Sequence, residues 1–245
     1  LEDEIHTSYA ARNTGARHAK GEALAFCDAD QVATESWLTN LLSHWHKRDK
    51  YAGFCGPCPV KAFSDAFMEQ YAEREKVGDW SRGDRNCTVW HYGAGNLCVP
   101  RERFRQVGGF DGRRPSAEDF EFTRRLCRSV GAPLLYIARA TAWHRARPSL
   151  GSILRQRVRL GYAAEIHEDE GTRSLGRPRE KDFMKVLTIG LGVPVAIGKD
   201  LLAGRWGGLH LRAAWKGLNF LERAAFALGR LARRFGVPVE RMGGM

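Results

Sequence analysis

Apolar residues in the first half of the chain follow two patterns, short continuous runs and helical spacing, which alternate along the sequence. The run Ala23–Cys27 is continuously apolar, which predicts a short strand of a buried parallel sheet. The segment before it predicts a helix that Asn13 caps and Gly21 ends. After it, Trp and Leu recur at helical spacing over residues 34–45 and predict a core-facing helix. This alternation predicts the α/β fold class, with a sheet flanked by helices.

The same alternation continues to about residue 147. The patterns predict further strands at 51–60 and 133–137, and helices at 63–80, 116–130 and 149–162. Ser116 is a suitable cap for the helix that it begins, and Gly131 is a suitable end for the same helix. The regular part of the chain is long enough to form one sizeable domain with its own core.

The carboxyl-terminal part is both basic and apolar. Residues 145–245 carry 19 Lys and Arg against 9 Asp and Glu, whereas residues 1–144 carry 20 against 19. The apolar stretch 186–198 has 13 residues, fewer than the roughly 20 that span a bilayer, and the segment 205–235 places Leu, Trp and Phe among Arg and Lys. These features predict peripheral or re-entrant association with the cytoplasmic face of the cell membrane. Nucleic acid is the less favoured partner, and two helices packed on the preceding domain remain the alternative.

Six cysteines are scattered without the spacing of a disulfide framework, which favours a reducing environment. Cys55 and Cys58 copy the Cys-x-x-Cys spacing of dithiol oxidoreductases. A redox cysteine of that kind needs a helix amino terminus to lower the pKa of its thiol, whereas Pro59 and Val60 follow this pair at once. We therefore interpret the segment as the small-residue end of a strand and keep dithiol chemistry as the less favoured hypothesis.

Two pairs of acids occupy positions where chemistry is expected. Asp28 and Asp30 follow a predicted strand at its carboxyl end, which is where open α/β sheets bind ligands. Two carboxylates so close together repel each other, and a hard cation such as Mg²⁺ or Mn²⁺ relieves that repulsion. Glu118 and Asp119 open a predicted helix, where acids either stabilise the helix start or supply a general base.

Several short motifs occur in an order that resembles glycosyltransferase family 2, whose members have the GT-A fold. The motifs are Ala11-Arg12-Asn13-Thr14-Gly15, Gly21-Glu22, Asp28-Ala29-Asp30, Gly95-Asn96, Val107-Gly108-Gly109-Phe110-Asp111 and Glu118-Asp119. The resemblance extends to about His144 and covers more than half of the chain. It implies a GT-A-type, Rossmann-like mixed sheet flanked by helices. Because the family carries its first nucleotide-binding strand and helix upstream of this point, we expect the sequence to be truncated at its N-terminus.

The resemblance implies a metal-dependent, inverting glycosyltransferase that moves a sugar from a nucleotide-sugar donor to a glycan or lipid-linked acceptor, as in polysaccharide biosynthesis. Asp119 is the expected general base, and Glu118 is expected to orient the acceptor. Mn²⁺ or Mg²⁺ is the expected cofactor, held by Asp28, Asp30 and His144. The residues expected to bind the nucleotide or its diphosphate are Arg12, Asn13, Asp28, Gly95, Asn96, Arg155 and Arg159.

The expected organisation has three segments, namely a catalytic domain at 1–147, a basic helix with a linker at 148–182, and a membrane-associated helical appendage at 183–245. Gln156-x-x-Arg159-Leu160 resembles an element of processive polysaccharide synthases, but Leu160 stands where that element has Trp, which argues against processive polymerisation. The alternative function is that of a basic, membrane-associated binding protein whose GT-A-like core is degenerate and does not catalyse transfer.

Overall fold

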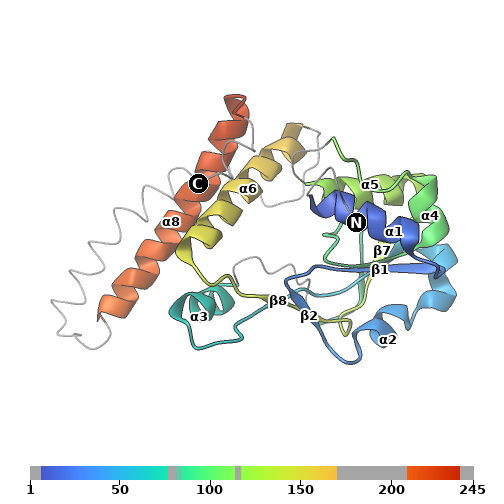
Figure 1. Ribbon diagram of the computed structural model, residues 1–245, viewed down its shortest axis with the longest axis horizontal. Helices are drawn as coiled ribbons and strands as arrows, with labels where there is room; N and C mark the ends of the chain where they lie inside the picture. Colours follow the sequence, from blue (N-terminus) through green and yellow to red (C-terminus); the bar gives the residue numbers. More distant parts are fainter. Residues whose placement is uncertain (1–6, 77–81, 83, 114–116, 170–208, 238–245) are drawn as a thin grey trace. The chain divides into compact units, whose positions relative to one another are not determined.

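The computed structural model describes residues 7–76, 82, 84–113, 117–169 and 209–237 (Figure 1). The chain divides into two compact units, Leu1–Ala146 and Arg147–Met245, which are described separately.

A five-stranded mixed sheet forms the centre of the first unit. Its strands, in spatial order, are β1 (Ala23–Cys27), β6 (Asn96–Pro100), β3 (Gly53–Cys55), β7 (Leu134–Tyr136) and β5 (Cys87–Val89). β6 runs antiparallel to both of its neighbours, and β3 and β7 form the parallel pair. The mixed α/β architecture expected from the sequence is thus present.

β1 confirms the predicted strand but not its predicted environment. Among the described strands it lies at the edge of the sheet and pairs antiparallel with β6. Leu24 is buried, whereas Ala25 and Cys27 are exposed. The prediction of a buried parallel strand was wrong because Ala and Cys bury little area, so a run of them can lie at an exposed edge at small cost.

A second, three-stranded sheet joins the segment after Asp30 to the end of the first unit. It contains β2 (Gln31–Ala33), β8 (Ala142–Arg145) and β4 (Val60–Lys61), in that order. β2 and β8 are antiparallel, with Gln31 opposite His144. This pairing brings two segments more than a hundred residues apart to one place.

Six helical segments among the described residues of the first unit surround the sheets. They are α1 (Ser8–His18), α2 (Trp37–Leu42), the 3₁₀ helix η1 (Trp45–Lys50), α3 (Phe67–Arg74), α4 (Arg101–Gln106) and α5 (Glu118–Val130). Figure 1 shows α1, α4 and α5 on one side of the five-stranded sheet and α2 on the other. The helix predicted over 34–45 is thus divided into α2 and η1, and the helix predicted over 63–80 is shorter, its end at 77–80 lying outside the described residues.

Two of the predicted helix starts were wrong in detail. The cap of α1 is Thr7, whose hydroxyl accepts a hydrogen bond from the backbone N–H of Ala10, so Asn13 lies inside the helix. α5 begins after Ala117, which has a left-handed backbone at φ 61°, and Ser116 lies outside the described residues. The predicted end of α5 is confirmed, because Gly131 adopts φ 71°, a conformation that glycine adopts without strain.

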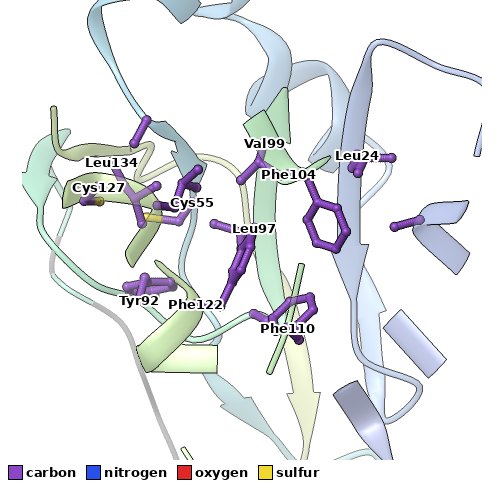
Figure 2. Close-up of a cluster of buried hydrophobic side chains, with 14 of the residues drawn as sticks. Leu24, Cys55, Tyr92, Leu97, Val99, Phe104, Phe110, Phe122, Cys127 and Leu134 are labelled. Atoms are coloured by element: carbon purple, nitrogen blue, oxygen red, sulfur yellow. The ribbon is translucent and has the colours of Figure 1, made fainter. Parts of the chain in front are cut away.

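The core between the five-stranded sheet and its helices is rich in aromatic side chains (Figure 2). Phe110 and Phe122 have ring centroids 4.4 Å apart, and Phe104 contacts both rings. These contacts join the Gly-Gly-Phe segment to α4 and α5 and hold the start of α5 against the sheet.

Cys55 lies in this core, and Cys58 is also buried. Burial raises the pKa of the Cys55 thiol well above its ordinary value, which is opposite to the low pKa of a redox cysteine. Gly56 packs so closely that a Cβ atom there would lie 2.2 Å from the carbonyl oxygen of Ala140. The segment is therefore the packed end of β3, and the dithiol hypothesis is not retained.

The second unit contains α6 (Leu150–Asp169) and α8 (Leu209–Arg234), which pack side by side in parallel (Figure 1). Their backbones touch at Gly161 and Gly229. A Cβ atom on Gly161, for example, would lie 2.0 Å from the carbonyl oxygen of Phe226. Two ion pairs flank this contact, Arg157 with Glu222 and Arg230 with Glu165. In the part of the chain that the structure describes, no helix is both long and apolar enough to cross a bilayer. The apolar stretch 186–198 lies outside that part.

Candidate active site

Arg12 connects the two pairs of acids that the sequence singled out. Its Nη2 atom donates a hydrogen bond of 2.5 Å to Oδ1 of Asp28, and its Nη1 atom lies 3.5 Å from Oε1 of Glu118. Ser8, one turn earlier on α1, donates its hydroxyl hydrogen to the same Glu118 oxygen at 2.8 Å. α1 thereby holds the end of β1 and the start of α5 together through side chains.

The charge of Arg12 is stabilised by these acids. Burial by itself lowers the pKa of Arg12, but attraction to Asp28, Asp119 and Glu118 outweighs it, and the pKa is raised. The Nη1 atom is buried and makes no hydrogen bond. Its nearest acid is Glu118, whose Oε1 atom forms an ion pair with it at 3.5 Å but no hydrogen bond.

The loop between β5 and β6 passes directly between the two acidic motifs. A Cβ atom on Gly95 would lie 2.6 Å from Oδ2 of Asp28, and one on Gly93 would lie 3.3 Å from Oδ2 of Asp119. Between them, the backbone N–H of Ala94 donates to Asp119 at 3.4 Å. Because Gly93 and Gly95 have no side chains, Asp28 and Asp119 can each approach the backbone of this loop, one from either side.

Asp119 has the electrostatic properties of a general base. Burial raises its pKa to about 6, the neighbouring Glu118 adds to the increase, and Arg12 with the N–H groups of Phe120 and Ala94 opposes it. A carboxylate with a pKa near 6 is ionised at neutral pH and is a stronger proton acceptor than an ordinary Asp. It lies at the amino-terminal turn of α5, where the helix dipole also favours a negative charge.

The three residues predicted to hold a metal are only partly brought together. Nε2 of His144 lies 3.5 Å from Oδ2 of Asp30, as the pairing of β2 with β8 requires. Asp28 instead faces Arg12, and within the described residues no three acidic, His or Cys side chains form a cluster that could hold a metal ion. The half-exposed Asp30 carboxylate and the His144 imidazole fit a divalent cation such as Mn²⁺ as two ligands, with the others left to substrate and water.

Two residues predicted to bind nucleotide have structural roles. Asn13 donates to the carbonyl of Phe110 and accepts from its N–H, both at 2.9 Å, and so fastens α1 to the segment before α5. The fully buried Asn96 donates to the carbonyls of Pro57 and Ala140 and accepts from the indole N–H of Trp37. A contact of either amide with a ligand would require these bonds to be broken.

A pocket of about 610 Å³ lies between α1 and β1. Its charged lining residues are Arg12 and Asp28, and most of the others have small side chains, such as Ala16 and Ala25. The pocket therefore offers a cation and a carboxylate beside an apolar surface, which suits a ligand with a phosphate group and a flat, weakly polar ring.

Three residues of this region were missed in the sequence. Gln31 accepts a hydrogen bond from the N–H of Asp28 at 3.2 Å and so fixes the turn between the two acids. Thr123 accepts from the N–H of Tyr92 and orders the loop against α5. Ser8 binds Glu118 as described above. Helical spacing places Ser8 four residues before Arg12 and Thr123 four after Asp119, which is the signal that could have identified them.

Arg155 and Arg159, also predicted to bind the diphosphate, lie on α6 in the second unit. Both side chains are exposed.

Comparisons with known proteins bear on this arrangement. Residues 6–104 match the family described as Glycosyl transferase family 2. Glycosyltransferase AglE of Haloferax volcanii is 29% identical over 172 residues, which cover 66% of this chain and 51% of AglE, so the chain spans about half the length of that relative. The fold is also similar to that of mannosyltransferase PcManGT from Pyrobaculum calidifontis, whose structure was determined in complex with GDP-Man and Mn²⁺. The TM-score is 0.53 and the sequence identity 16%, and the match covers 94% of this chain and 68% of PcManGT. The similarity to PcManGT concerns the fold alone.

Proposed function

We propose that this chain, of which residues 6–104 match glycosyl transferase family 2, is a metal-dependent, inverting enzyme that transfers a sugar from a nucleotide-sugar to a hydroxyl group of a glycan or lipid-linked acceptor. The observation that carries the proposal is the pair of acidic motifs joined by Arg12, with Asp119 at a pKa of about 6 beside the glycine loop.

Asp119 is the general base of this proposal. It takes the proton of the acceptor hydroxyl while the oxygen forms its bond to the anomeric carbon of the donor sugar. The bond between that carbon and the diphosphate breaks, and its electron pair leaves with the nucleoside diphosphate. A single displacement of this kind inverts the configuration at the anomeric carbon. Glu118 lies next to the base and can accept a hydrogen bond from a second acceptor hydroxyl.

Arg12, Asp28 and Asp30 take part in binding the nucleotide-sugar donor. The Nη1 atom of Arg12 makes no hydrogen bond, which supports a role in binding a phosphate oxygen, and Asp28 orients Arg12 through their hydrogen bond. Asp30 and His144 would hold Mn²⁺ or Mg²⁺, which neutralises negative charge on the leaving diphosphate when it is bound. PcManGT, of similar fold, is reported with Mn²⁺ and GDP-Man, which supports a divalent cation and a nucleotide-sugar as ligands here.

The test measures the melting temperature of the chain with GDP, UDP and dTDP, each with and without Mn²⁺. A ligand that binds the native state raises the midpoint, so we expect a rise for one nucleotide that needs Mn²⁺ and is lost in Asp30→Ala. Glu102→Gln, an exposed acid on α4, is the matched control. Asp119→Asn should keep the nucleotide-dependent rise but lose release of nucleoside diphosphate from the nucleotide-sugar. A folded chain without any metal-dependent rise would instead favour the binding protein with a degenerate core.

A further inference from the structure

The outward side of α8 carries a row of large apolar side chains. Leu221, Leu228, Leu231 and Phe235 are exposed by 40%, 55%, 41% and 81%. Their spacings of seven, three and four residues place the three leucines on one face of the helix, and Phe235, directly after the end of α8 at Arg234, continues that face. We call these four residues the α8 outer face.

The α8 outer face is not needed to hold α8 on α6. Other positions of α8 make that contact, since Gly229 packs against Val158 and Ala232 clusters with Tyr162 and Ile166 of α6. Glu222 and Arg230, also buried there, form ion pairs with Arg157 and Glu165 of α6. A helix that packs through one set of positions and exposes leucines at another has an apolar surface that remains to be covered.

The charges beside the α8 outer face are positive. Arg223 is exposed, and Arg234 is 57% exposed although it also binds Glu165. At 100° per residue, both lie beyond the Leu231 edge of the apolar row, about 60–80° around the helix from Leu231. Residues 145–245 carry a net charge of +10, from 19 basic and 9 acidic side chains. A partner must therefore be apolar where the leucines meet it and negative around them.

We propose that the α8 outer face inserts into the interfacial region of a membrane with an anionic surface. A lipid surface satisfies both conditions, since acyl chains cover the leucines while anionic headgroups meet the arginines. A second copy of the chain satisfies only the first condition, because two identical faces would bring their arginines together and like charges repel. The inference is drawn from the second unit alone and does not depend on the proposed transferase function.

The test is flotation of the full chain with vesicles of neutral phosphatidylcholine and with vesicles that also contain 30% phosphatidylglycerol. We expect binding to the anionic vesicles, weakened by high salt. Leu231→Glu and Leu228→Glu should each reduce partitioning roughly tenfold, and Arg223→Glu should weaken binding to anionic vesicles only. Leu38→Glu is the matched control, because Leu38 is 45% exposed on α2 of the first unit. Circular dichroism establishes that each variant keeps its helices.

Three results would overturn the proposal. Vesicle binding that is the same in Leu228→Glu and Leu231→Glu as in the unchanged chain would exclude the α8 outer face. Equal binding to neutral and anionic vesicles would exclude the charge requirement. A dimer in light scattering that Leu231→Glu dissociates would identify a second copy as the occupant. Metal-dependent nucleotide binding, measured without vesicles, reports on the proposed transferase function separately.

Discussion

Gly95 and Asp28 lie in such close contact that a Cβ atom at position 95 would come within 2.6 Å of Oδ2 of Asp28. The same Cβ atom would lie 2.6 Å from Nε2 of Gln31, the residue that fixes the turn after Asp28. The loop that orders Asp119 is therefore in contact with the end of β1, where the backbone of Gly95 packs against the side chains of Asp28 and Gln31.

Gly95→Ala should displace Asp28 from Arg12, because the added methyl group overlaps the carboxylate. We expect a loss of about 1–3 kcal/mol in the free energy of unfolding and a nucleotide affinity weakened by about tenfold or more, measured by calorimetric titration with Mn²⁺ present. Gly217→Ala on α8, where nothing lies within 4 Å of the added atom, is the control. Unchanged affinity in Gly95→Ala would show that the contact does not position the donor site.

The rate of transfer should depend on pH through Asp119. Its pKa is raised to about 6, and a base must be ionised, so the rate should rise about tenfold per pH unit below 6 and level off above it. Release of nucleoside diphosphate from pH 4.5 to 8 measures this profile. Asp119→Asn should lose at least about a hundredfold in rate at pH 7.5. The assignment fails if the Asn variant keeps the rate and its rise near pH 6.

Asn13→Ala should destabilise the first unit without changing the chemistry. The substitution leaves the N–H and carbonyl of Phe110 without partners, at a cost of about 1–3 kcal/mol in the free energy of unfolding. Urea unfolding measures the loss. Asn40→Ala, which removes an exposed amide bonded to Arg139, should cost less. If nucleotide affinity fell tenfold in Asn13→Ala while stability held, Asn13 would be a binding residue after all.

Glu165→Ala should strongly destabilise the pair of α6 and α8. It leaves the buried Arg230 guanidinium without its carboxylate, and breaking a buried pair by removal of one partner costs about 3–5 kcal/mol. Arg234→Ala should cost about 1 kcal/mol or less, since that side chain is 57% exposed. Thermal unfolding by circular dichroism compares the two variants. Equal small losses would show that the Arg230–Glu165 pair is not a stabilising contact.

Local pattern predicted the parts of the fold that depend on neighbours in sequence. The run Ala23–Cys27 forms a strand and Gly131 ends a helix, because strand pattern and backbone freedom are properties of a few consecutive residues. The same reasoning could not place Ala23–Cys27 at the edge of the sheet, because the order of strands depends on the whole chain.

Side-chain roles were harder to predict than the positions of the motifs. Asn13 was expected to bind nucleotide, but its partner Phe110 lies 97 residues away, and the partners of Asn96 include Ala140, 44 residues away. An amide that satisfies distant backbone and one that binds a ligand have the same local sequence. The contact of Arg12 with Glu118 was missed for the same reason, since no spacing connects the two residues.

The position of β1 at the edge of the described sheet has a consequence for assembly. The outer side of an edge strand presents backbone N–H and carbonyl groups to any strand that can add to it. β1 ends at Cys27 and Asp28 follows at once. A strand that paired with β1 would therefore fix the backbone next to Asp28, whose carboxylate binds Arg12. The five residues of β1 would in this way connect contacts between subunits at this edge with the chemistry of the site.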